Sequence, residues 1–134
     1  MHALYRINLC RGEDRSFPVT LVYHNPETGA REAADITGRR FFLTVRNEPE
    51  GEVLARLSSD DGGILLGKMV DREFVETSDA VTTILIQFTH DITEKLIGRK
   101  MAYDLFVISG EGADEIRQCL MAGEVKAMPS ACYG

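Results

Sequence analysis

The sequence contains no tryptophan, and aromatic residues make up only 7% of its 134 positions. Side chains that could stack on sugars or bases are therefore scarce. No apolar run approaches the roughly 18 residues that a membrane-spanning helix needs. The first residues alternate between polar and apolar types, whereas the core of a signal peptide is continuously apolar. We therefore expect a protein that neither spans a membrane nor carries a secretory signal.

Positive charge is in short supply. Lys and Arg total 15 against 21 Asp and Glu, which gives a formal net charge of −6. The densest basic groups are only pairs, Arg39–Arg40 and Arg99–Lys100. Because a phosphate backbone repels a negatively charged protein, this composition disfavours nucleic-acid binding. A local basic patch that the fold assembles from distant residues is left open.

Cysteine is also rare. Cys10, Cys119 and Cys132 are odd in number and widely spaced, and none belongs to the C-x-x-C pairs that zinc or redox chemistry uses. We expect free thiols in a protein from a reducing compartment.

Recognisable catalytic and metal-binding motifs are missing as well. His2, His24 and His90 are far apart and fit no metal-ligand spacing. The acidic loop at 58–63 lacks the alternating acids of a calcium loop, and the acids at 111–115 sit in a glycine-flanked hairpin that offers no burial to raise a pKa. The sequence therefore predicts no enzyme, and no catalytic, cofactor-binding or metal-binding residues.

What the sequence does contain is a repeated alternation of apolar and polar residues, which is typical of β-strands with one buried face. Ile84, Ile86 and Phe88 show this period, with Leu85, Gln87 and Thr89 between them. The same period recurs at 5–9, 17–23, 41–45, 53–57 and 103–107. Turn signals separate these segments, so we predict one domain over residues 1–134, an all-β sandwich or barrel of about seven to nine short strands.

Three segments depart from this alternation. Asp91–Glu94 predicts a short helical turn near residues 91–97, with Asp91 at its N-cap. Residues 68–80 fit neither the strand nor the helix period and are interpreted as weak strand or loop. Ala122-Gly123 predicts a turn between a strand at 116–121 and a last strand at 125–128.

Several short motifs carry a family resemblance. They are Tyr5-Arg-Ile-Asn-Leu9, Arg11-Gly-Glu-Asp-Arg-Ser-Phe17, Asp35-Ile-Thr-Gly38, Phe42-x-Thr-Val45, Ile86-Gln-Phe-Thr89, Thr93, Leu96, Tyr103-Asp-Leu-Phe-Val107 and Gly123-Glu-Val125. In this order they resemble small bacteriophage and prophage structural proteins, notably the N-terminal domain of phage baseplate upper proteins. The likeness spans nearly the whole chain. It departs between Gly67 and Ala80, where this chain is longer than the pattern.

The resemblance implies an Ig-like antiparallel β-sandwich that serves as a non-catalytic structural or assembly component of a tail or baseplate. It implies no active-site residues. The implied partners are other virion or tail proteins and further copies of the chain, with neither nucleic acid nor membrane, and the implied location is the bacterial cytoplasm during assembly and then the virion. The alternative is a β-sandwich that recognises a carbohydrate or a cell-surface partner, which the lack of tryptophan disfavours for sugars.

Overall fold

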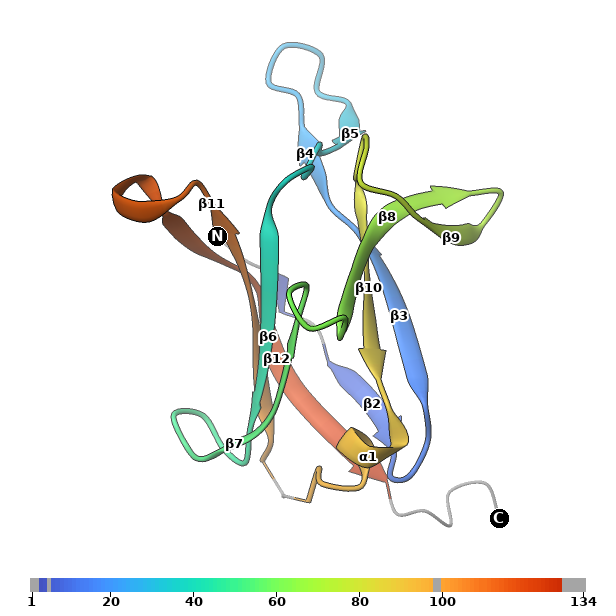
Figure 1. Cartoon of the computed structure of the whole chain (residues 1–134), viewed down its shortest axis with the longest axis vertical. Helices are drawn as coiled ribbons and strands as arrows, with labels where there is room; N and C mark the ends of the chain where they lie inside the picture. Colours follow the sequence, from blue (N-terminus) through green and yellow to red (C-terminus); the bar gives the residue numbers. More distant parts are fainter. Residues whose placement is uncertain (1–2, 5, 98–99, 129–134) are drawn as a thin grey trace.

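Two β-sheets face each other across a shared hydrophobic core (Figure 1). The computed structural model describes residues 3–4, 6–97 and 100–128. The first sheet has the spatial order β1 (Ala3–Leu4), β12 (Ile116–Met128), β11 (Ala102–Ser109), β6 (Arg40–Arg46) and β7 (Val53–Ser58), and β2 (Ile7–Cys10) pairs with the end of β12. The second sheet has the order β3 (Arg15–Thr20), β10 (Thr83–Phe88), β8 (Ile64–Val70) and β9 (Glu73–Glu76). β4 (Val22–His24) and β5 (Arg31–Ala33) form a separate hairpin.

This strand order is that of an Ig-like sandwich. In such folds strands B, E and D belong to one sheet and strands G, F, C and C′ to the other. Here β3–β10–β8 take the B–E–D positions and β12–β11–β6–β7 the G–F–C–C′ positions, so the predicted all-β sandwich is confirmed. Two details were wrong. The described residues form twelve strands, because several are too short to show a period, and β1 and β2 run parallel to β12.

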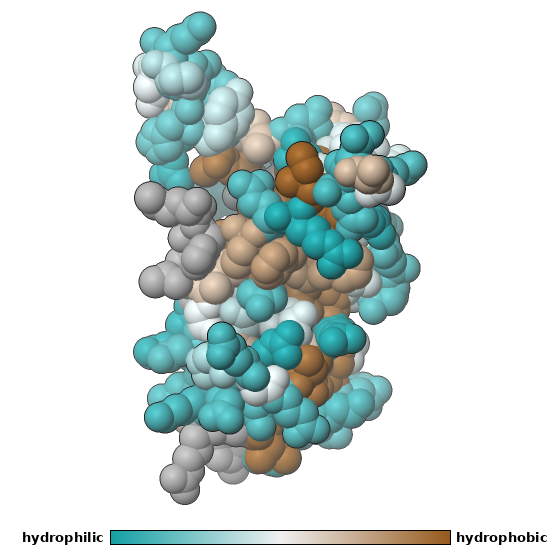
Figure 2. Space-filling model, turned by 90° about the vertical axis from the view of Figure 1, so that its left-hand side faces the viewer, coloured by the Kyte–Doolittle hydropathy of each residue, from teal (hydrophilic) through white to brown (hydrophobic). Residues whose placement is uncertain are grey.

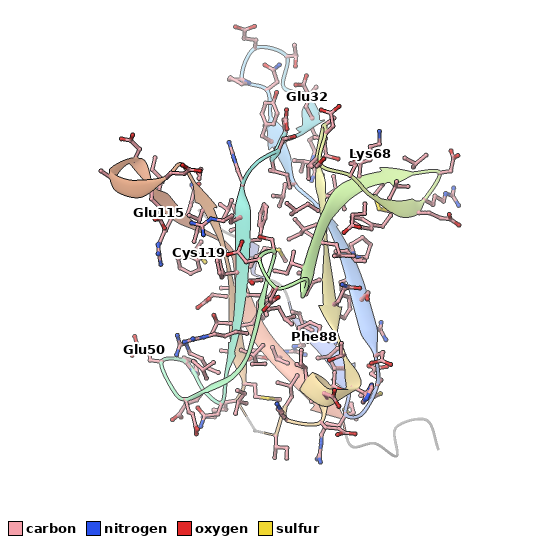
Figure 3. The ribbon with its side chains drawn as sticks, viewed as in Figure 1. Glu32, Glu50, Lys68, Phe88, Glu115 and Cys119 are labelled. Carbon is pink, nitrogen blue, oxygen red and sulfur yellow. The ribbon has the colours of Figure 1, made fainter. Side chains whose placement is uncertain are left out.

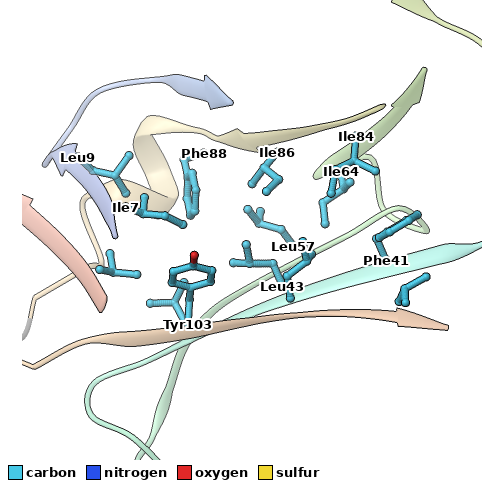
Figure 4. Packing of buried hydrophobic residues seen from close by; sticks show 14 of the residues in the cluster. Ile7, Leu9, Phe41, Leu43, Leu57, Ile64, Ile84, Ile86, Phe88 and Tyr103 are labelled. Carbon is cyan, nitrogen blue, oxygen red and sulfur yellow. The ribbon is translucent and has the colours of Figure 1, made fainter. Parts of the chain in front are cut away.

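The alternating apolar residues form the core between the sheets (Figure 4). Phe41, Leu43 and Val45 of β6 have no exposed surface, as the period of two requires. From the second sheet, Phe88 meets the ring of Phe17 edge to face at 6.1 Å between ring centroids. Each fully buried side chain of this size stabilises the fold by about 1.5–3 kcal/mol relative to its exposed state.

A short helix, α1 (His90–Thr93), crosses between the sheets after β10, close to the predicted position. The predicted N-cap was wrong. Asp91 lies inside the first turn, the N-cap is Thr89, and its side chain makes no capping bond. Instead Oδ1 of Asp14, in the turn between β2 and β3, accepts a hydrogen bond of 2.6 Å from the backbone N–H of His90. A tertiary contact replaces the local capping pattern, which the sequence alone does not reveal.

Two further segments differ from the prediction. Residues 68–80, interpreted as weak strand or loop, contain the end of β8 and the whole of β9, which pair as a hairpin from Gly67↔Glu76 to Val70↔Glu73. The hairpin has no consistently buried face, so it lacks the expected period. Ala122-Gly123 is not a turn. β12 passes straight through it, because Ala122 pairs with Asp104 of β11 on one side and with β1 on the other.

The predicted strand at 17–23 is divided between two sheets. Leu21 donates its N–H to Thr82 at 3.2 Å, next to the last β3–β10 pair, while its carbonyl accepts the N–H of Ala34 at 2.8 Å. The chain therefore leaves β10 at Leu21 and continues into the β4–β5 hairpin, which projects from one end of the sandwich in Figure 1.

No helix within the described ranges has the length and apolar content that crossing a bilayer requires.

Candidate interaction surface

The outer face of the first sheet carries a cluster of arginine and phenylalanine side chains. Leu43 and Val45 of β6 are buried, so the pleat turns the residues between them outward. The cluster spans four adjacent strands and lines a hollow of about 500 Å³. We call it the arginine face; its members are Arg40, Phe42, Arg46, Arg56, Phe106 and Arg117.

The cross-strand register brings these side chains together. Phe42 of β6 lies opposite Phe106 of β11, and Phe106 lies opposite Cys119 of β12. Two residues further along β6, Thr44 has Asp104 of β11 on one side and Arg56 of β7 on the other. Side chains opposite each other on one face of a sheet lie within contact distance. Two half-buried phenylalanines therefore occupy the middle of the face, with arginines around them.

The arginines differ in how far their charge is compensated. Arg40 and Arg117 share Oε1 of Glu115, at 3.9 Å and 3.0 Å, and Arg40 also faces Asp60 at 3.6 Å. Because a guanidinium has five N–H donors, each keeps donors available for a partner. The Arg40 guanidinium also lies 5.9 Å from the centroid of the Phe42 ring, within cation–π range.

Arg46 and Arg56 complete the face. Arg46 donates to the carbonyl oxygen of Gly51 at 3.1 Å, which orients its guanidinium without neutralising it. Arg56 is exposed and makes no ion pair within the described part of the chain. The arginine face is therefore locally basic on a chain whose net charge is −6.

Asp104 is the acidic group within this surface. Burial raises the pKa of its carboxyl above the ordinary value, and the nearby charge of Arg46 opposes that shift. The same partial burial raises the pKa of the Cys119 thiol, with a smaller contribution from Asp104. Asp104 and Cys119 are themselves half-buried, so the middle of the arginine face is already partly screened from water, which lowers the cost of covering it further.

The side of the molecule that holds this sheet faces the viewer in Figure 2, where hydrophobic residues gather near the middle and hydrophilic residues surround them. Figure 3 places Glu115 and Cys119 on this side of the ribbon. An apolar centre with a charged rim, containing arginine and aromatic residues, is the composition of protein–protein contact surfaces.

The acids of the loops at 58–63 and 111–115 stabilise local structure. Oδ1 of Asp61 accepts the N–H groups of Ser58 at 3.2 Å and Gly63 at 2.8 Å, which fixes the turn between β7 and β8. Glu115, after the 3-10 turn η1 (Gly112–Asp114), pairs with arginines. Among the described residues, no group of three or more His, Cys, Asp or Glu side chains is arranged to hold a metal ion.

The two described histidines lie on different elements, and the two described cysteines differ in their bonding. His24 ends β4, and both ring nitrogens of His90 face acids, Asp14 at 3.0 Å and Asp91 at 3.3 Å. His2 and Cys132 lie outside the described residues. The expectation of free thiols was wrong for Cys10, which is disulfide-bonded, whereas Cys119 is free.

Sequence reasoning missed the arginine face, although a signal was present. Phe42, Thr44 and Arg46 alternate with the buried residues of β6, so one strand showed that its outer face is mixed rather than polar. Arg56, Phe106 and Arg117 come from three other strands, and only the sheet register brings them beside β6.

No family model matches the sequence, and no curated protein is similar enough to count as a relative. The resemblance to phage structural proteins therefore stays a prediction from sequence motifs, and the arginine face has to be interpreted from its own chemistry.

Proposed function

We propose that this protein is a non-catalytic assembly component that docks onto a partner protein through the arginine face. The observation that carries the proposal is the face itself, in which Phe42 and Phe106 are surrounded by arginines and Arg56 has no ion-pair partner among the described residues. Arginine and aromatic residues dominate the binding energy of most protein interfaces. An arginine without a partner can pair with an incoming acid without first breaking another ion pair.

The setting we propose is a phage or prophage tail or baseplate, with other tail proteins as partners, assembly in the bacterial cytoplasm and final incorporation into the virion. The sequence resemblance supports this setting, and the Ig-like strand order agrees with the fold that the resemblance implies. A scaffold protein needs rigid surfaces rather than a reactive group, which suits a face built on four paired strands.

The alternative class is a recognition module for a carbohydrate or a cell-surface molecule. A hollow lined by two phenylalanines and several hydrogen-bond donors would suit a small anionic sugar. The proposal and this alternative differ in what occupies the face, so binding of soluble glycans in an array, lost on substitution of Arg56, would favour the recognition module.

The test begins with the genes on either side of this one. If they encode tail or baseplate proteins, their products are co-expressed with the wild-type chain and with the Arg56→Glu variant. We expect a stable complex with one product and a dissociation constant at least about tenfold higher for Arg56→Glu.

The matched control is Lys95→Glu, which makes the same charge change at an exposed residue just after α1. Equal binding by wild type and Arg56→Glu would show that the face is not the docking surface. Neighbouring genes for polysaccharide or metabolic enzymes would remove the phage setting.

A further inference from the structure

The hairpin formed by the end of β8 and by β9 projects beyond the sandwich (Figure 1). We call residues 68–79 the acidic arm. β10 pairs with β8 only from Ile64 to Gly67, so among the described strands the rest of β8 pairs with β9 alone. Two strands alone are marginally stable and expose both faces. Such an arm is expected to gain stability by packing against another surface.

The arm combines exposed apolar residues with uncompensated acids. Met69, Val70 and Val75 are 37–42% exposed and account for three of the eight large apolar side chains that the described residues leave exposed. Four acids accompany them, against the two bases Lys68 and Arg72, and none of the four makes an ion pair among the described residues. The four acids are Asp71, Glu73, Glu76 and Asp79.

The register puts one useful set of side chains on a single face of the arm. Val70 lies opposite Glu73, and Lys68 lies opposite Val75, so these four side chains share that face, with Glu73 nearest the tip and Lys68 at the base. The turn Asp71-Arg72 holds the tip, with φ values of 51° and 70° that match a type I′ hairpin turn. The arm is therefore a preformed element that presents two valines beside a carboxylate.

The other projecting hairpins do not offer the same combination. In the β4–β5 hairpin, Oε2 of Glu32 accepts a hydrogen bond of 2.8 Å from the hydroxyl of Tyr23. At the tip between β11 and β12, Glu115 is held by Arg117 at 3.0 Å. The acids nearest to the exposed apolar groups of these two hairpins are already engaged, whereas those of the acidic arm are available.

The arm complements the arginine face in charge and apolar character, and the two lie on opposite sides of the molecule. Figure 3 shows Lys68, at the base of the arm, on the side away from Glu115 and Cys119. The arm therefore cannot reach the arginine face of its own chain. We propose that the acidic arm of one copy docks on the arginine face of a second copy, with Glu73 pairing with Arg56 and the valines covering Phe42 and Phe106.

This inference rests on the proposed function, because it names one occupant of the docking surface. The contact joins two different surfaces of identical chains, so it repeats from copy to copy and produces either a closed ring or a filament. A tail or baseplate is built from such repeated contacts.

Sedimentation velocity over a concentration series tests the proposal. The wild-type chain should form species larger than a monomer. Arg56→Glu and Glu73→Arg should each raise the dissociation constant for self-association by about tenfold or more. Raising the salt concentration should weaken association of the wild type, since the contact pairs exposed charges. Lys95→Glu and Glu27→Arg make matched charge changes at exposed residues outside the arm and the face and should associate like the wild type.

Mixing the two charge-reversal variants gives the sharpest result. Each variant alone brings like charges together at the contact. In their mixture the arm of one variant meets a face of opposite charge on the other, so the mixture should recover the association that neither variant shows alone. The double variant, with both charges reversed, should recover self-association. Circular dichroism of each variant confirms that the fold is retained.

A wild-type chain that remains monomeric at its highest soluble concentration overturns the inference, as does self-association that both reversals leave unchanged. If the chain is monomeric while a tail protein still binds through Arg56, only the inference about the second copy fails. If no protein depends on Arg56, the proposed function fails as well.

Discussion

The backbone N–H of His90 donates a hydrogen bond of 2.6 Å to Oδ1 of Asp14, across 76 residues of sequence. The same carboxylate oxygen lies 3.0 Å from Nδ1 of the His90 ring. One acid in the β2–β3 turn therefore both caps α1 and binds its first side chain. Nearby, the hydroxyl of Thr93 donates to the carbonyl of Glu13 at 2.8 Å and accepts the N–H of Gly12 at 3.0 Å. These hydrogen bonds hold the β2–β3 turn against α1, the connection between the two sheets.

This contact predicts a pH dependence. The bond to Asp14, and then the charge of Asp91, raise the pKa of His90 above its ordinary 6.5, while the bonds from His90 lower the pKa of Asp14 below 3.8. The His90 contribution is complete below pH 6.5 and is lost as the pH rises through the raised pKa. The Asp14 contribution is present above pH 3.8 and is lost as the pH falls through the lowered pKa.

We therefore expect the contact to contribute most between the two ordinary values. NMR titration of the His90 ring should give a pKa above 6.5 in the wild type, and a clearly lower one in Asp14→Asn. Asp91→Asn should lower it less, because Asp91 acts only through its charge. An unchanged pKa in Asp14→Asn would contradict this account of the contact.

Gly67 is required where β8 leaves β10 and continues into the acidic arm. A methyl group on Gly67 would collide with the carbonyl oxygen of Val75 and lie 2.7 Å from Cζ of Phe74. Gly67→Ala should therefore lower the free energy of unfolding by about 1–3 kcal/mol, the usual cost of overpacking. Chemical denaturation measures this change.

Gly29→Ala serves as the comparison, because Gly29 has a φ of 73° but no atom within 4 Å of the added methyl. It should cost only about 1 kcal/mol, from the backbone strain alone. Equal costs at both positions would show that the close approach of β9 to Gly67 is not what excludes a side chain there.

Arg72 occupies a backbone conformation that favours glycine, with a φ of 70° in the tip of the acidic arm. Arg72→Gly should stabilise the hairpin by about 1 kcal/mol, because Asp-Gly is a preferred sequence for this turn type. Arg72→Ala removes the same charge but keeps the strain, so it should bring no such gain. A thermal melt of both variants beside the wild type checks the prediction, and equal gains would assign the effect to charge instead.

The disulfide at Cys10 predicts a redox-dependent stability. Cys10→Ser should lower the free energy of unfolding by about 2–4 kcal/mol under oxidising conditions and have little effect in the presence of a reductant. Cys119→Ser is the matched control, since Cys119 is free and half-buried. If both variants melt at the wild-type temperature without reductant, the disulfide does not stabilise the fold.

The sequence predicted the fold where one face of a strand is buried. The strands around Phe41, Ile84 and Leu105 have strict alternation because each contributes to the core, and the structure confirms all three. The sequence did not predict the β8–β9 hairpin, because both of its faces meet solvent and its residues therefore show no alternation. Ala122-Gly123 suggested a turn, but pairing partners on both edges of β12 keep the chain extended there.

The candidate site could not be predicted from sequence patterns either, because its residues come together only through pairing between strands. The arginine face depends on the register of four strands, and the β-bulge between Leu105 and Phe106 shifts which residue of β12 meets Phe106. No local pattern specifies that shift. The alternation in β6 showed only that Phe42 and Arg46 share a face.

The central claim is that the arginine face is a protein-docking surface, and the most direct test observes its guanidinium groups. The Nε–Hε resonances of the arginines are recorded by NMR before and after addition of a binding partner, either a neighbouring tail protein or more of the same chain. We predict that the signals of Arg46, Arg56 and Arg117 shift, while those of Arg15 and Arg31, on β3 and β5, stay in place. A partner that binds while all three face signals remain unchanged would contradict the claim.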